Sequence, residues 1–327
     1  MIFARALAAL FAVMLTTAAS AQTYPSRPIT LIVPFPPGGA TDAIARIIQT
    51  AMSQSLGQQL IIENIGGAGG SIAASRAARA APDGYTIMIH QVALAASMSM
   101  YSKTLTYDVE RDFTAVGLIN TAASTVAARA SLPPTNFAEL VSWMKQPGQN
   151  TKVAHAGVGS FGHLAGVLLT QEVGAAATQV PYRGAGPALN DLLAGVPDIS
   201  SISAVQAGPL IKAGRLKGYA IIGRNRFAGL PELPTMAEVG YSKLTLDFWH
   251  MLLVPAGTPQ PIIDKVNTAL RAAFADPVVA KAFTDGGMEL FPQDQWTPQA
   301  ASALLSRETK MWGEVIRANN ISAPDQN

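Results

Sequence analysis

The sequence predicts an α/β fold with a largely parallel sheet, divided between two domains. Short β-rich runs alternate with helical patterns along the chain, as in βαβ units. A strand breaks into a glycine- or proline-rich turn and a helix begins at once within Leu31–Asp42, Val153–His163 and Gln179–Ala188. Two extended runs, Val116–Ala127 and Phe248–Val254, are expected to cross between the domains. One domain is therefore predicted to be discontinuous, with the middle of the chain inserted as the second.

The N-terminal residues predict a secretory signal peptide. Arg5 precedes an apolar run from Ala6 to Leu15, and Ala19-Ser20-Ala21 is a small-residue cleavage signal. The run is shorter than the roughly 20 apolar residues that span a bilayer. We expect cleavage after Ala21 and export of a soluble protein to the periplasm. The alternative is a buried N-terminal helix.

Composition excludes several classes of protein. The 327-residue chain contains no cysteine, so it has no disulfide, no thiolate nucleophile and no cysteine-based metal site. Its formal net charge is +2 without a lysine- or arginine-rich block, so nucleic acid is not expected as a partner. His90, His155, His163 and His250 lack the spacing of a catalytic zinc site. We expect neither a metal nor a cofactor.

The individual elements follow from hydrophobic periodicity and turn residues. In the first part of the chain we expect strands at Ile29–Val33, Gln59–Glu63 and Tyr85–Ile89, and helices at Thr41–Leu56 and Ile72–Ala80. In the middle part we expect strands at Lys152–Ala156, Gln179–Pro181 and Leu216–Ile222, and helices at Phe161–Val173 and Pro187–Leu193.

Capping residues mark further helix starts. Asn136 and Glu139 form a variant of the capping box. Thr258, Asp276 and Thr297 each precede a proline, the pattern of an N-cap followed by the first helical residue, so three helices are predicted near the C-terminus. Together with the crossings, these elements predict lobe 1 at residues 22–124 and 246–327 and lobe 2 at residues 125–245.

The repeated strand–turn–helix device predicts a binding function. A helix N-terminus offers unpaired N–H groups and the positive end of a dipole, so it suits a carboxylate or phosphate. Gly157–Gly162 also matches a dinucleotide-binding pattern, but such a site needs an acid after the next strand, and Val180–Arg183 supplies none. The remaining readings are an anion site capped by Ser160 and a simple tight turn.

Ser160 does not match a catalytic serine. A nucleophile elbow has a glycine two residues before the serine, and that position is Val158. His163 lies on the same helix turn, at the edge of the expected cleft, without an orienting acid nearby in sequence.

Two other turns carry candidate ligand groups. Arg183 could grip a carboxylate or form an ion pair with Asp191, whereas the backbone N–H groups of Gly184 and Ala185 are the safer ligand donors. Gly38 and Gly39 permit close backbone approach, and Asp42 beside them is more typical of a capping acid than of a ligand group. Gly66–Ser71 is a further candidate turn, or only a connection.

These residues resemble a known family, the periplasmic solute-binding proteins of tripartite tricarboxylate transporters, also called the Bug family. The resemblance spans the chain after the signal peptide, and its motifs occur in order. They are Tyr24–Ile29, Val33–Asp42, Glu63-Asn64 with Gly67–Gly70, Pro82–Thr86, Tyr107-Asp108 with Arg111–Phe113, Gly159–Gly166, Val180–Gly184, Ile211–Gly214, Leu233–Glu238 and Pro255–Pro259.

The resemblance implies a type II periplasmic-binding-protein (Venus flytrap) fold, with two lobes, central mixed sheets and two crossing strands. It also implies a non-enzymatic protein that binds a small organic carboxylate (a di- or tricarboxylate or an aromatic carboxylate) and delivers it to a membrane permease. We expect a monomer. A ligand sensor for a signalling partner and a secreted hydrolase using Ser160 are the alternative functions.

By position, the resemblance places ligand contacts on backbone amides and hydroxyls of both lobes, often through bridging waters. His90, Gln91 and Ser203 lie in segments that depart from the family's usual residues, and they are expected to shape the distal end of the ligand. The remaining expected contacts are Phe35, Gly38, Gly39, Thr41, Ser160, His163, Tyr182, Arg183, Gly184 and Ala185.

Overall fold

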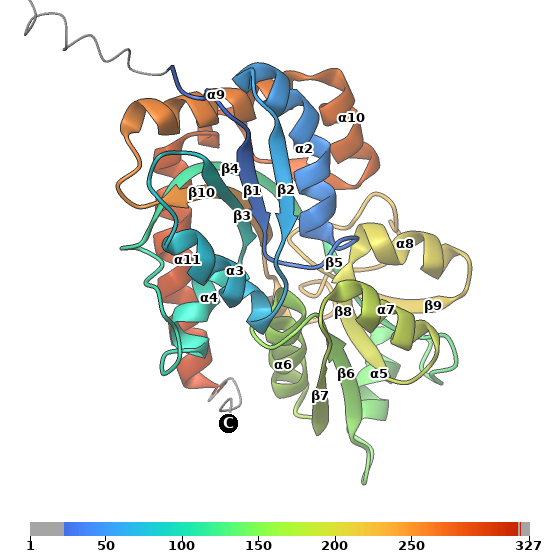
Figure 1. Cartoon of the computed structure of the whole chain (residues 1–327). Helices are drawn as coiled ribbons and strands as arrows, with labels where there is room; N and C mark the ends of the chain where they lie inside the picture. The colour runs from blue at the N-terminus through green and yellow to red at the C-terminus, as the bar shows by residue number, and fades with distance from the viewer. Residues whose placement is uncertain (1–22, 320, 322–327) are drawn as a thin grey trace, which may run out of the picture.

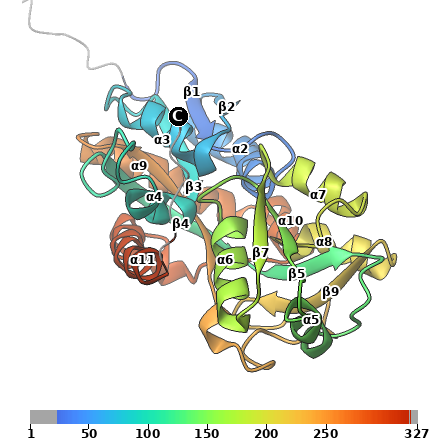
Figure 2. The same cartoon turned by 90° about the horizontal axis from the view of Figure 1, so that it is seen from below.

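Two lobes, each built around its own mixed β-sheet, make up the computed structural model of the chain (Figures 1 and 2). The structure describes residues 23–319 and 321. The predicted signal peptide, residues 1–21, lies outside the described residues.

Lobe 1 contains a six-stranded sheet in the order β11-β4-β10-β3-β1-β2. The central strand β10 runs antiparallel to β3 and β4, whereas β1 runs parallel to β2 and β3. All eight residues of β10 are buried, because helices cover both faces of the sheet. The strands are β1 (Ile29–Val33), β2 (Leu60–Asn64), β3 (Thr86–Gln91), β4 (Phe113–Ala122), β10 (Phe248–Pro255) and β11 (Met288–Leu290).

Lobe 2 contains a five-stranded sheet in the order β7-β6-β8-β5-β9. Here β6 is parallel to β7 and β8, and β5 is antiparallel to β8 and β9. The parallel strands end at one edge, where their connections lead into helices. The strands are β5 (Ser124–Arg129), β6 (Thr151–His155), β7 (Ala177–Pro181), β8 (Ile199–Ser203) and β9 (Leu216–Ile222).

The helices of lobe 1 pack on both faces of its sheet (Figure 1). One group is α2 (Ala40–Leu56), α9 (Gln260–Ala275) and α10 (Pro277–Asp285), and the other is α3 (Ser71–Ala78), α4 (Ala93–Met100) and α11 (Pro298–Ala318). The helices of lobe 2 are α5 (Phe137–Met144), α6 (Phe161–Val173), α7 (Ala185–Leu193) and α8 (Ala204–Lys212).

The chain crosses between the lobes twice. Only Ala123 separates β4 from β5, so the first crossing is almost a continuous strand. The second crossing is the longer connection 223–247, between β9 and β10. The lobe 1 sheet thus draws its strands from both ends of the chain, while the lobe boundaries after residues 124 and 245 remain a prediction.

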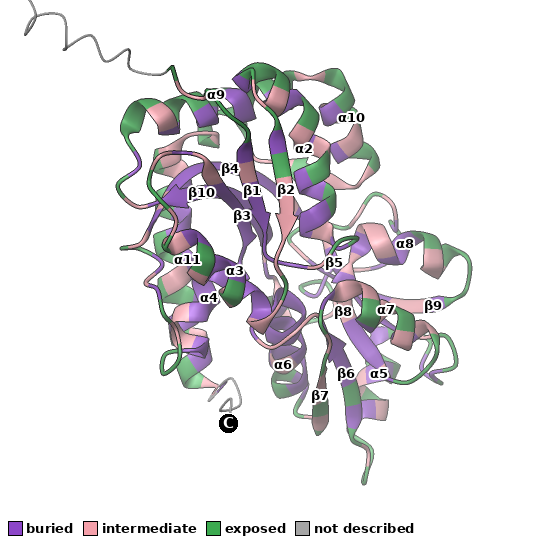
Figure 3. Ribbon diagram, in the orientation of Figure 1, coloured by how far each residue is buried: buried purple, intermediate pink, exposed green. Residues whose placement is uncertain are grey.

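The buried residues, purple in Figure 3, fall into two main hydrophobic clusters. One fills the space between the lobe 1 sheet and α2, α9 and α10. The other continues from the opposite face of that sheet into lobe 2, and it includes the fully buried Trp249 and Trp312. Apolar packing is therefore continuous from lobe 1 into lobe 2.

The structure also corrects parts of the sequence prediction. The N-caps Asn136, Asp276 and Thr297 are confirmed, since each accepts a hydrogen bond from a backbone N–H of its helix. The predicted cap at Thr258 is wrong: its hydroxyl donates to the carbonyl of Pro255, and α9 begins after Pro259. The single run predicted at 116–127 consists of two strands, and the prediction omitted α4, β8, α8 and β11.

Candidate functional site

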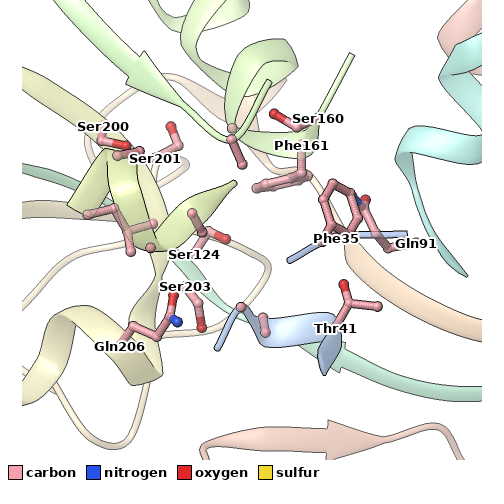
Figure 4. Close-up of a pocket in the computed structure, with 18 of the residues that line it drawn as sticks. Phe35, Thr41, Gln91, Ser124, Ser160, Phe161, Ser200, Ser201, Ser203 and Gln206 are labelled. Carbon is pink, nitrogen blue, oxygen red and sulfur yellow. The ribbon is translucent and has the colours of Figure 1, made fainter. Parts of the chain in front are cut away.

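A cavity of about 90 Å³ lies between the two lobes, where the helices begin (Figure 4). This volume is smaller than the roughly 150 Å³ of an engineered cavity that binds benzene, so only a small molecule fits the cavity as it stands. Both lobes contribute: Phe35 and Thr41 come from lobe 1, and Ser160 and Ser203 come from lobe 2.

Helix N-termini converge on this cavity. Residues at the starts of α2, α6, α7 and α8 line it, namely Gly39, Ser160, Ala185 and Ser203. The unpaired N–H groups and dipoles of these helices favour a negative charge. None of the described residues that line the cavity is charged, so an anion there would be stabilised by neutral donors.

Ser160 is the N-cap of α6 and is 2% exposed. Its Oγ accepts a hydrogen bond from the backbone N–H of His163 at 3.3 Å. The ring Nδ1 of His163 in turn accepts the backbone N–H of Gly159 at 3.2 Å. His163 therefore holds the turn that presents Ser160.

Two neutral histidine rings support this turn. His155 and His163 lie with ring centroids 4.5 Å apart. Burial lowers the pKa of His163 to about 4; burial and the neighbouring His163 lower the pKa of His155 to about 3. Near neutral pH both rings are uncharged, so Nδ1 of each can accept a backbone N–H, from Gly157 for His155.

A second pair of histidines, His90 and His250, is buried in lobe 1 next to residues that line the cavity. The hydroxyl of Thr41, which lines the cavity, is 3.2 Å from Nε2 of His250. His90 and His250 are almost fully buried, and burial is the main cause that lowers their pKa values to about 4 and about 3. The side-chain Oε1 of Gln91 accepts a hydrogen bond from the backbone N–H of Ala93. The side-chain NH₂ group of Gln91 is left to donate to a ligand in the cavity that Gln91 lines.

The predicted site residues divide into two groups. Those that line the cavity are Phe35, Gly39, Thr41, Gln91, Ser160, Ala185 and Ser203. Those that lie outside its lining are Gly38, His90, His163, Tyr182, Arg183 and Gly184. For the second group the structure shows supporting or neighbouring positions rather than direct exposure to the cavity.

The ion pair between Arg183 and Asp191, one of the two alternatives for this side chain, is absent from the described residues, whereas a contact of Arg183 with a ligand carboxylate stays a prediction. Arg183 is exposed and outside the cavity lining. Asp191 instead accepts a hydrogen bond from the hydroxyl of Tyr182 at 2.8 Å, and no ion pair joins it to Arg183. Of this turn, only Ala185 reaches the cavity.

Asp42 has a structural role. It accepts hydrogen bonds from the N–H of Gly38, from Arg46 and from Asn64, all at 2.9 Å. Burial alone would raise the pKa of Asp42, but these hydrogen bonds outweigh it and the pKa is lowered. The carboxylate therefore fixes the turn before α2, in keeping with the capping interpretation.

Sequence reasoning missed several lining residues. Phe161 and Phe248 stack with centroids 4.7 Å apart, and Ser124 and Gln206 add polar groups. Ser124 is the first residue of β5, and Phe248 is the first residue of β10. The signal available was position at the two crossings, where both lobes approach the same space.

Residues 23–319 contain no cluster of histidine, aspartate and glutamate suited to a metal ion. Within the same part of the chain, no helix has the length and apolar character needed to cross a membrane.

Comparison with known proteins identifies the family. The sequence profile described as "Tripartite tricarboxylate transporter family receptor" matches residues 44–321. The protein BugT of Bordetella pertussis is 34% identical over 303 residues, which cover 91% of each chain.

Solved structures agree with this match. The periplasmic binding protein BugD is 34% identical, with a TM-score of 0.87 over 92% of this chain and 100% of its own. MatC from Rhodopseudomonas palustris with bound malate is 35% identical, with a TM-score of 0.85 over 90% of this chain and 100% of its own. An R. palustris protein with adipate is 32% identical, with a TM-score of 0.85 over 92% and 100%. The predicted two-lobe periplasmic-binding-protein fold is confirmed, and the chain belongs to the tripartite tricarboxylate transporter receptor family.

Proposed function

We propose that this chain is a periplasmic solute-binding protein that captures a small organic carboxylate between its lobes and delivers it to a membrane permease. The main support for this proposal is that four helix N-termini converge on a cavity between the lobes, and that none of the described residues lining it is charged. The structures of two related proteins, one with bound malate and one with adipate, support the carboxylate class.

The proximal carboxylate binds at the start of α6 and α7. The Ser160 hydroxyl can donate to it, because the hydrogen bond from His163 uses only an oxygen lone pair. The N–H groups at Ala185 and Gly39, at the starts of α7 and α2, supply further donors. The distal part of the ligand meets Gln91, Ser203 and the stacked rings of Phe161 and Phe248.

The site binds without catalysis. A serine nucleophile needs a base that accepts its proton, with a third group to orient that base. Here the Ser160 oxygen meets the backbone N–H of His163, and the ring Nδ1 of His163 is occupied by Gly159. This arrangement caps a helix and shapes a turn, so the hydrolase alternative lacks its base.

Export follows from the N-terminal segment predicted to be a signal peptide with cleavage after Ala21. Membership of a transporter receptor family supports delivery to a permease. We expect the protein to act as a monomer. Mass spectrometry of the periplasmic fraction would test the cleavage, and loss of uptake on deletion would test delivery.

A thermal-shift screen of mono-, di- and tricarboxylates tests the binding function. A ligand at 100 times its dissociation constant adds about 2.7 kcal/mol to the free energy of unfolding, so the melting temperature should rise measurably. Sugars and phosphate esters serve as controls. A rise with these and with no carboxylate would overturn the ligand class, and turnover of ester substrates would restore the hydrolase alternative.

A further inference from the structure

Tyr101 joins the two lobes beside the cavity, without lining it. It directly follows α4 of lobe 1, and its hydroxyl donates a 2.5 Å hydrogen bond to the carbonyl of Val158. Val158 belongs to the turn between β6 and α6 of lobe 2. Tyr101 is 7% exposed and Val158 is half-buried, so this interlobe hydrogen bond is partly buried.

Glycines let the backbones of the two lobes meet at the same place. A β-carbon on Gly69 would lie 2.4 Å from the carbonyl oxygen of Val158 and 3.2 Å from the N of Ser160. A β-carbon on Gly159 would lie 3.0 Å from the ring of Tyr101. Gly69, within the Gly66–Ser71 turn considered above, is therefore a contact point for the other lobe. Anion binding by this turn stays a prediction.

The contacted turn is the one that presents Ser160. Residues 157–160 carry Val158 and Gly159, which touch Tyr101, and Ser160, which lines the cavity. Burial raises the pKa of the Tyr101 phenol, which therefore stays protonated and can donate to Val158 at any physiological pH. Tyr101 thus contacts the turn that carries Ser160 on the side away from the cavity, and it supports the residue expected to bind the ligand carboxylate.

We propose that Tyr101 and Gly69 form a closure latch, defined as these two residues and the 157–160 turn that they contact. The latch favours the closed arrangement of the lobes and positions Ser160, so it raises affinity for every ligand without touching any. Its effect on affinity rests on the proposed carboxylate binding, whereas its effect on closure does not. Tyr101 is in this sense a positioning residue.

The primary test measures the distance between the lobes. Since the chain has no cysteine, Gln54→Cys and Lys212→Cys give one spin label in each lobe, at exposed helix positions. We expect Tyr101→Phe to shift the distance distribution toward the open population, without ligand and with malate or adipate. The matched control is Tyr107→Phe, because the buried Tyr107 hydroxyl donates to Ser97 within lobe 1.

Gly69→Ala provides an independent arm. Its β-carbon would collide with lobe 2, so the closed population should fall sharply. Gly57→Ala is the control, because Gly57 has a similar positive φ, +72° against +61°, with no atom within 4 Å of the added carbon. Both variants bear the same kind of backbone strain, and only Gly69→Ala obstructs the lobes.

Affinity gives the last readout. Loss of one neutral hydrogen bond should weaken malate or adipate binding about 2- to 12-fold in Tyr101→Phe, and equally for each ligand that binds. Unchanged distance distributions in both Tyr101→Phe and Gly69→Ala would overturn the latch, as would a wild-type protein that is open under all these conditions. If no carboxylate binds but the ligand-free distances shift, the proposed function fails and the latch stands.

Discussion

At the scale of single residues, Ser160 combines two tasks that a substitution separates. Its oxygen caps α6, and its hydroxyl is free to donate to a ligand in the cavity that Ser160 lines. We expect Ser160→Ala to weaken all carboxylate ligands alike, because each presents a carboxylate to this end. Loss of a hydrogen bond to a charged group costs about 1.5–3 kcal/mol, or roughly 10- to 150-fold in affinity, which calorimetry would measure.

The matched control for this prediction is Thr297→Ala. Thr297 caps α11 through a comparable hydrogen bond to the N–H of Ala300, at 3.1 Å, away from the cavity. Both variants should lose about 1 kcal/mol of stability from the missing cap. If both also bind carboxylates normally, Ser160 does not contact the ligand.

At the scale of elements, the sequence predicts best where local turn and capping residues mark the ends of a helix or strand. The bounds predicted for α6 and β9 are those observed, and the caps of α5, α10 and α11 are confirmed. In contrast, α4 is mostly buried and built from small and apolar residues, so it has no amphipathic stripe to mark it. β8 reads Ile-Ser-Ser-Ile-Ser because it borders the cavity, and its polarity conceals a strand.

The candidate site likewise contains residues that local sequence features predict and residues that they do not. Ser160 and Ala185 could be predicted because capping and turn chemistry are local. Ser124, Phe248 and Gln206 were missed, since they meet the cavity only through the approach of two lobes distant in sequence, and the predicted crossings were the one signal for Ser124 and Phe248. The contact made by Tyr101 was not predicted for the same reason, because its partner Val158 is 57 residues away in the sequence.

The anchoring of α11 on β10 gives a prediction at this scale. Glu308 on α11 is 6% exposed and accepts a hydrogen bond from Nε1 of Trp249 on β10 at 3.2 Å. Burial raises the pKa of Glu308. A carboxyl with a raised folded pKa contributes stability at low pH that is lost as pH rises through that pKa.

Glu308→Gln keeps an acceptor for Trp249 and removes the buried charge. The variant should therefore gain stability relative to wild type at pH 7.5, and gain less at pH 4, as measured by urea denaturation midpoints. Glu314→Gln, on the same helix, is a control at another acid. A destabilisation at pH 7.5 equal to that at pH 4 would show that the carboxylate charge is not costly.

At the scale of the whole molecule, the two crossings predict a hinge motion. Ala123 and the connection 223–247 join lobes that otherwise touch around the cavity. A ligand that contacts both lobes favours the closed state over the open one. Small-angle scattering should show a smaller radius of gyration on saturation with a bound carboxylate. An unchanged radius alongside measured binding would contradict closure driven by the ligand and leave binding intact.

The four histidines give the whole fold a pH dependence with a defined sign. His90, His155, His163 and His250 all have pKa values lowered to about 3 or 4, mainly by burial. In the unfolded chain each titrates near its ordinary value of about 6.5. The unfolded state therefore binds more protons below that pH, so stability is fully present above about pH 6.5 and is lost as pH falls toward 4.

The window from pH 7.5 to 5.5 isolates this effect, because ordinary carboxyls stay ionised there. One pH unit below 6.5 costs about 1.4 kcal/mol for each ring that stays neutral, so four rings should lower the free energy of unfolding by several kcal/mol. The measurement belongs in the Glu308→Gln background, since Glu308 acts in the opposite direction. In that background, His155→Gln should reduce the loss of unfolding free energy between pH 7.5 and 5.5 by the contribution of one ring, about 1.4 kcal/mol. If stability instead stays level or rises as the pH falls from 7.5 to 5.5, the rings are protonated in the folded protein. Protonated rings could not accept the backbone N–H groups that shape the turn before Ser160.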